Sequence, residues 1–159
     1  MGRRFLRRSV LGGELERMFF GRYEHSIDEK GRMTIPARFR EALETGAYIT
    51  RGFDRNLVVY TTSYLNIISE KVQEMRNTDP SARLLRRLIY SNAALVEFDK
   101  AGRILIPQFL RDSVDIHNNA IVIGVGDYFE IWSPSIWEAQ NALLDDAETN
   151  IQRFSELNL

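Results

Sequence analysis

The feature that most constrains the fold is a nine-residue segment that occurs twice in the chain. The first copy, DEKGRMTIP, begins at Asp28, and the second, DKAGRILIP, begins 71 positions later at Asp99. Both copies follow the pattern D-x-x-G-R-x-x-I-P. A repeat at this distance is too long for a solenoid unit and is typical of a duplicated half-domain.

The pattern predicts a tight β-hairpin turn in each copy. Aspartate at the first position and glycine at the fourth are favoured in a type I turn. A glycine in the left-handed region after such a turn closes the hairpin through a bulge. The residues expected to build the two turns are Asp28, Gly31, Asp99 and Gly102.

The remainder of each motif predicts an outgoing strand and then a short helix. Ile35 and Ile106 are expected to anchor the strands in a core. Pro36 and Pro107 suit the first position of a helix, where no backbone N–H is needed. Over residues 28–43 and 99–114, six of sixteen aligned positions are identical, so the two halves share more than the turn.

The rest of the chain predicts further strands and amphipathic helices. Asp79-Pro80 is a helix-start signal, and in the helix that follows Leu84 is expected to face inward and Arg86 outward. A final helix is expected to run from Ser133-Pro134 to Ala147. The fold class is therefore mixed β/α. Interleaving the halves into one closed barrel would remove open sheet edges.

Three segments are expected along the chain. Residues 1–17 are arginine-rich and are interpreted as a disordered basic leader, with a phosphate-gripping arm as the alternative. Residues 18–92 would form the first repeat with its helices, and residues 93–159 the second repeat with a C-terminal helix. Met18 is a candidate for the original start of translation.

The net charge of −1 conceals an uneven distribution of charge along the chain. Residues 18–111 carry a net charge of +4, and residues 112–159 carry −8. A polarised chain is compatible with nucleic-acid binding, although the acidic C-terminal residues could equally form a solvated helix face. There is no cysteine, which excludes disulfides and thiolate metal sites. No apolar run approaches the roughly 20 residues of a membrane span.

Catalytic and cofactor sites have little support in the sequence. His25, Ser26 and Asp28 are the residue types of a catalytic triad, but adjacent strand residues point to opposite faces. The two histidines are 92 positions apart, which gives no metal-ligand spacing. The G-x-G sequence at 124–126 lacks the third glycine of a phosphate loop and is interpreted as a hairpin turn. We therefore expect no enzyme activity, no cofactor and no metal.

Each of the two repeated turns has cations beside it. Arg32 and Arg103 follow the turn glycines, and Lys30 and Lys100 lie within the turns. A two-stranded ribbon fits the major groove of B-DNA, where arginine pairs with guanine. Two further basic residues, on the short helices, could reach phosphates: Arg40 and Arg111. The alternative for the Asp–Arg pairs is an internal salt bridge that holds each turn.

The motif with its following R-E/D resembles the AbrB-type DNA-binding motif, and two tandem copies after Met18-Phe19-Phe20-Gly21 resemble the MraZ family. This resemblance implies a swapped-hairpin (double-split) β-barrel in which Arg32 and Arg103 contact DNA. It also implies a repressor of its own division and cell-wall gene cluster, which binds short direct repeats upstream as a ring-shaped homo-oligomer. The expected location is the cytoplasm, on the nucleoid. An antitoxin-like protein that binds a protein partner is the alternative.

Overall fold

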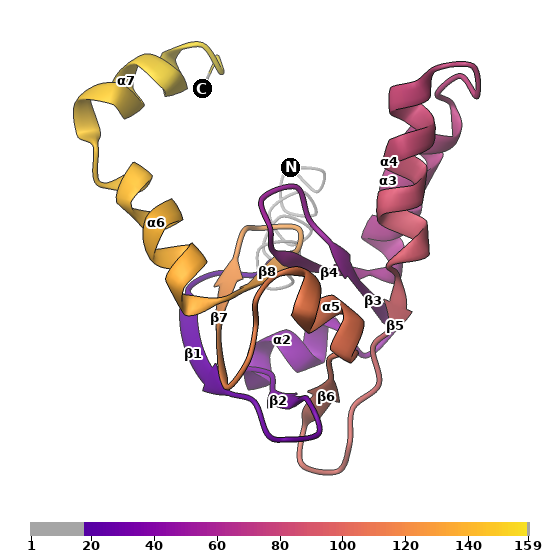
Figure 1. The fold of residues 1–159 in the computed structure, drawn as a ribbon, viewed down its shortest axis with the longest axis vertical. Helices are drawn as coiled ribbons and strands as arrows, with labels where there is room; N and C mark the ends of the chain where they lie inside the picture. The colour runs from indigo at the N-terminus through magenta and orange to yellow at the C-terminus, as the bar shows by residue number, and fades with distance from the viewer. Residues whose placement is uncertain (1–17, 159) are drawn as a thin grey trace, which may run out of the picture.

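The structure, a computed structural model, describes residues 18–158, so the expected leader lies outside the described residues. Figure 1 shows a β-rich body that carries two helical arms. The strands are β1 (Arg22–Ser26), β2 (Arg32–Thr34), β3 (Ala47–Arg51), β4 (Leu57–Thr61), β5 (Ala94–Leu95), β6 (Arg103–Leu105), β7 (Asn119–Gly124) and β8 (Phe129–Trp132). The helices are α2 (Ala37–Ala42), α3 (Thr62–Gln73), α4 (Pro80–Ser91), α5 (Gln108–Ser113), α6 (Pro134–Leu144) and α7 (Ala147–Ser155). The predicted mixed β/α class is confirmed.

The strands pair antiparallel in two groups. Six of them form one sheet in the order β1-β7-β8-β4-β3-β5, and β2 pairs with β6 in a separate ribbon. Equivalent strands of the two halves face each other at two places. In β2 and β6 the central pair is Met33 with Ile104, and in β4 and β8 it is Val58 with Glu130. Antiparallel pairing of equivalent strands is what a pseudo-two-fold axis between the halves requires.

The halves also exchange their first strands. β1 of the first half pairs with β7 of the second, and β5 of the second half pairs with β3 of the first. The first strand of each half therefore finds its hydrogen-bonding partner in the other half. A few strands alone are marginal in water, so this exchange explains why one chain carries both copies.

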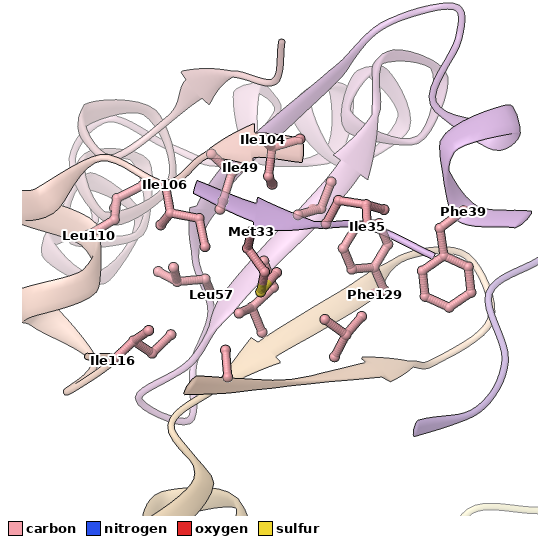
Figure 2. Close-up of a cluster of buried hydrophobic side chains, with 14 of the residues drawn as sticks. Met33, Ile35, Phe39, Ile49, Leu57, Ile104, Ile106, Leu110, Ile116 and Phe129 are labelled. Atoms are coloured by element: carbon pink, nitrogen blue, oxygen red, sulfur yellow. The ribbon is translucent and has the colours of Figure 1, made fainter. Parts of the chain in front are cut away.

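The main hydrophobic core lies between the halves (Figure 2), and Trp132 belongs to a smaller cluster with Ile121 and Ile123. Ile35 and Ile106 are fully buried, as predicted for the anchors of the outgoing strands. The other large side chains that are less than 2% exposed come from both halves: Phe19, Met33, Ile49, Leu57, Ile104, Leu110, Ile116, Phe129, Ile131 and Trp132. Each short helix adds one buried side chain, Phe39 from α2 and Leu110 from α5.

The helices α3 and α4 form one helical arm, and α6 and α7 form the other; the two arms leave the body on opposite sides (Figure 1). Asp79 caps α4 through a 2.9 Å hydrogen bond from the Ser81 N–H, and Pro80 occupies the first turn, as predicted. The Thr50 hydroxyl donates to the Ile89 carbonyl and attaches α4 to β3. Among residues 18–158, no helix has the length and apolarity needed to cross a membrane.

The orientation predicted for α4 is wrong at two positions. Leu84 is 67% exposed, whereas Arg86 turns toward α3 and donates to the carbonyl oxygens of Val72 and Met75. These carbonyls lie at and just beyond the C-terminal end of α3, and that of Val72 also accepts a hydrogen bond from the Met75 N–H at 3.2 Å. Arg86 takes an inward position because its guanidinium donates to backbone acceptors there, which a leucine could not do.

The predicted single C-terminal helix is divided into α6 and α7. α6 ends at Leu144, and Asp146 caps α7 by accepting a hydrogen bond from the Thr149 N–H at 3.2 Å. The buried Asn150 side chain donates to the carbonyls of Leu143 and Leu144 at the end of α6. Local capping by aspartate and asparagine thus stops the helix where the sequence periodicity continues.

Pro36 and Pro107 each lie one position earlier than predicted. They occupy the N-cap positions of α2 and α5 with extended ψ values of 138° and 141°. The expected order of turn, basic residue, strand and helix is otherwise observed in both halves.

Candidate nucleic-acid interface

In the first turn, Asp28 organises its neighbours through both carboxylate oxygens. Its Oδ1 accepts hydrogen bonds from the backbone N–H groups of Lys30 and Arg32, at 3.0 and 2.9 Å. Its Oδ2 accepts from the Arg32 Nε at 2.7 Å. Gly31 has a φ of +87° and donates its N–H to the Asp28 carbonyl, which closes the predicted turn.

The second turn repeats this arrangement. Oδ1 of Asp99 accepts from the N–H groups of Ala101 and Arg103, both at 2.9 Å, and Oδ2 accepts from the Arg103 Nε at 2.9 Å. Gly102 has a φ of +75°. In both turns, therefore, the aspartate accepts hydrogen bonds from two backbone N–H groups and the glycine has a positive φ.

These hydrogen bonds favour ionised carboxylates. The Arg32 backbone N–H, followed by the Arg32 guanidinium, holds the pKa of Asp28 below its ordinary value. The Arg103 backbone N–H and guanidinium lower the pKa of Asp99 in the same way. Both aspartates are therefore negatively charged near neutral pH, and each fixes the direction of one arginine.

The two turns are tied to each other across the ribbon. The Ile35 N–H donates to the Gly102 carbonyl at 3.3 Å, and the Ile106 N–H donates to the Gly31 carbonyl at 2.9 Å. A cross-repeat ion pair adds to this, because Arg103 Nη1 lies 3.5 Å from Asp28 Oδ2. The sequence contained no signal for this ion pair.

Arg40 and Arg111 each lie against the turn of the other repeat. The Arg111 Nε donates to the Ile106 carbonyl at 2.9 Å, and its guanidinium covers Gly31 so closely that a Cβ there would lie 2.7 Å from Cζ. Arg40 covers Gly102 in the same manner. The two arginines predicted to reach phosphates therefore also brace the turns, a role that the sequence did not reveal.

The ribbon of β2 and β6 has one buried and one outward face. Met33 and Ile104 fill the core, whereas the outward positions alternate with them along each strand. The outward side chains are Arg32, Thr34, Arg103 and Leu105. Sequence reasoning identified the two arginines and missed Thr34 and Leu105, which alternation along the short strands could have indicated.

The predicted internal salt bridges are present, but they do not bury the arginines. The side chains of Arg32 and Arg103 are 35% and 32% exposed. Only Nε of Arg32 is hydrogen-bonded within the described part of the chain, so its two terminal nitrogens are available to a ligand. Lys30 and Lys100 are exposed at the turns beside them.

The other candidate sites are not assembled. His25 faces inward with its Nε2 buried, while the neighbouring Ser26 is exposed, as strand alternation predicts. Burial lowers the pKa of His25. The glycines at 124–126 lie in the hairpin between β7 and β8, where the Val125 N–H donates to the Tyr128 carbonyl at 3.0 Å.

A comparison with known families decides the relationship of this chain. A family model described as an antitoxin-like MraZ protein matches twice in tandem, over residues 18–88 and 89–155. The chain belongs to the MraZ family. The two matches together span the two halves that exchange their first strands, and the predicted resemblance is confirmed.

Curated members of the MraZ family are similar over most of this chain. The protein named Transcriptional regulator MraZ from Thermomicrobium roseum is 49% identical over 127 residues, which cover 80% of this chain and 89% of the relative. The protein of the same name from Roseiflexus castenholzii is 42% identical and covers 88% and 99%. That from Herpetosiphon aurantiacus is 45% identical and covers 89% and 100%.

Proposed function

We propose that this chain is a sequence-specific DNA-binding transcriptional regulator that reads guanines with Arg32 and Arg103. The observation that carries the proposal is the outward face of the β2–β6 ribbon, where two aspartates hold two partly exposed arginines in fixed directions. The name of the curated relatives, Transcriptional regulator MraZ, supports the same function.

The geometry suits the major groove. A two-stranded ribbon can enter this groove, and an arginine whose Nε is already bound to a carboxylate presents its terminal nitrogens to the O6 and N7 acceptors of guanine. Holding the side chain in advance lowers the entropy lost on binding. Lys30 and Lys100 would contact phosphates at the two ends of the ribbon.

Arg40 and Arg111 would add phosphate contacts close to the turns that they brace. Both are only partly buried, and their guanidinium groups lie on Gly102 and Gly31. A phosphate bound there would have a fixed position relative to the turn, and therefore relative to the arginine that contacts the base. These contacts position the protein on the duplex and carry no sequence information of their own.

The finer features of the proposal follow the family resemblance. The protein would repress its own division and cell-wall gene cluster by binding short direct repeats upstream, as a ring-shaped homo-oligomer on the cytoplasmic nucleoid. Linked copies gain avidity when the spacing of DNA repeats matches that of the subunits. The ribbon would close a swapped-hairpin barrel through the bridges Ile27–Met33 and Phe98–Ile104.

Fluorescence anisotropy with the gene's own upstream DNA tests the proposal at a stated salt concentration. Arg32→Ala and Arg103→Ala should each weaken specific binding by about 1–3 kcal/mol, the contribution of one bidentate base contact. The matched control is Arg87→Ala, which removes the same charge from the exposed side of α4, away from the ribbon. The proposal is overturned if the folded arginine variants of the ribbon bind as tightly as the control does.

Salt dependence separates base reading from phosphate binding. Lys30→Ala and Lys100→Ala should weaken binding to all sequences alike. Each should also reduce the slope of log K against log salt by about 0.9 for every phosphate that the variant no longer neutralises. Arg32→Ala should mainly reduce the difference between specific and scrambled DNA.

A further inference from the structure

The outward face of the β2–β6 ribbon is not symmetric. In the antiparallel register Arg32 lies opposite Leu105, and Arg103 lies opposite Thr34. Leu105 and Thr34 are equivalent positions of the two repeats, each the second residue after the arginine of its own motif. The pseudo-two-fold axis thus relates two arginines that are alike and two neighbours that differ in polarity.

The Leu105 side chain makes no contribution to the hydrophobic core described above. Its side chain is 57% exposed, and it lies outside the hydrophobic core, whereas the adjacent Ile104 and Ile106 are buried. Residues directly opposite in an antiparallel pair point to the same side of the sheet. An apolar side chain therefore lies opposite Arg32 on the outward face, at a place where the equivalent site of the other repeat has a threonine.

We propose that Leu105 contacts the 5-methyl group of a thymine next to the guanine read by Arg32; this rests on the proposed function. In the major groove the thymine methyl is the one apolar feature of the base edges, and apolar side chains recognise it. Thr34 offers a shorter side chain with a hydroxyl group beside Arg103, so a thymine contact in the second half of the site would be weaker.

The asymmetry gives each bound molecule a direction on DNA. A reader with perfect two-fold symmetry binds equally well in both orientations on a duplex. Because Leu105 marks one side of the ribbon and Thr34 the other, one orientation places leucine on thymine and the opposite one does not. Successive copies of the protein on one duplex would then face the same way.

The test begins with selection of bound sequences from a random duplex library by the full-length wild-type protein. We expect guanine contacts from both arginines and a thymine selected most strongly beside one of them. In the selected site, replacing that thymine by deoxyuridine removes the methyl group alone. The wild type should then bind about fourfold more weakly, the loss expected for one apolar carbon no longer buried.

Two variants assign this loss to Leu105. Leu105→Thr introduces the residue found at the equivalent position 34, so it suits the same strand geometry, and its shorter side chain should lower the preference for the thymine over the deoxyuridine duplex. Leu105→Val keeps an apolar group and should retain most of the preference. The reciprocal change, Thr34→Leu, should strengthen the thymine preference beside the second guanine.

The outcomes separate the inference from the proposed function. A preference for thymine that is as large in folded Leu105→Thr as in the wild type, or a selected site without thymine, overturns the role of Leu105 while Arg32→Ala still weakens specific binding. Loss of oligomers in Leu105→Thr with an unchanged thymine preference would assign the leucine to protein contact and also overturns it. If Arg32→Ala leaves specific binding intact, the proposed function itself fails.

Discussion

Arg103 Nη1 lies 3.5 Å from Oδ2 of Asp28, a carboxylate that already holds Arg32 at 2.7 Å in the other repeat. Within residues 18–158 no corresponding ion pair joins Arg32 to Asp99. Asp28 therefore contacts the guanidinium groups of both arginines of the ribbon, whereas Asp99 contacts one. The two aspartates occupy the same motif position but contribute unequally to the outward face.

This inequality predicts different effects of the same substitution. Asp28→Asn should reduce the ratio of specific to scrambled DNA affinity more than Asp99→Asn, because it releases Arg32 and also removes the second carboxylate beside Arg103. Removing either negative charge also strengthens non-specific attraction to phosphates, so the ratio, measured by anisotropy at fixed salt, is the informative quantity. Equal ratios in the two variants would contradict the cross-repeat role of Asp28.

Gly31→Ala should destabilise the protein by about 1–3 kcal/mol, because a side chain is strained in the left-handed region. The new Cβ would also press on the Arg111 guanidinium. Urea unfolding followed by circular dichroism measures the change. In the background of Arg111→Ala the cost of Gly31→Ala should be smaller but still positive, since the strain remains when the clash is removed. A neutral Gly31→Ala in the wild-type background would exclude the strained turn.

Low pH should lower the stability that the two turns contribute to the folded protein. The pKa values of Asp28 and Asp99 are lowered in the folded protein, so their ionised forms stabilise it above the ordinary pKa of 3.8. That stabilisation is lost as the pH falls below this value through the lower folded pKa. Urea midpoints should therefore decline more steeply from about pH 4 downward in the wild type than in Asp28→Asn/Asp99→Asn. Parallel declines would show that other carboxylates dominate acid unfolding.

High pH should destabilise the protein by ionising Tyr60 of β4. Burial raises the pKa of Tyr60 to about 12, and its ring packs on Tyr64 and Tyr128 with centroids 5.6 and 5.2 Å away. Because the folded pKa exceeds the ordinary value of 10, stability is intact below that pH and declines as the pH rises toward 12. Tyrosinate absorbance should show a late ionisation that Tyr60→Phe removes. Complete titration of every tyrosine near pH 10 in the folded protein would contradict this prediction.

Much of the local structure could be predicted because it depends on neighbouring residues. Asp28 and Gly31 specify the turn through contacts that span only four positions, and Asp79-Pro80 starts a helix through its own backbone. The predictions failed where a distant partner outweighed the local pattern. Arg86 turns inward because its guanidinium donates to carbonyl groups at the end of α3, and periodicity carries no information about those acceptors.

In the candidate site, too, the local features could be predicted and the contacts with distant residues could not. The repeated motif identified Arg32, Arg103 and the aspartates that hold them. It did not show that Arg111 braces Gly31, that Asp28 reaches Arg103, or that Leu105 lies beside Arg32. Each of these contacts joins residues of different repeats, and their pairing depends on how the halves are interleaved.

By itself the sequence determined the two turns, the duplication, and which residues of each outgoing strand are buried or face outward. These features follow from residue types at short, constant spacings. Only the tertiary structure decided which strands pair, which arginine braces which turn, and which neighbour each reading arginine has. The physical reason is that the pseudo-two-fold packing of the halves is held by a shared core of buried side chains, such as Met33 against Ile104. That packing brings together residues about 70 positions apart, a distance at which no local rule applies.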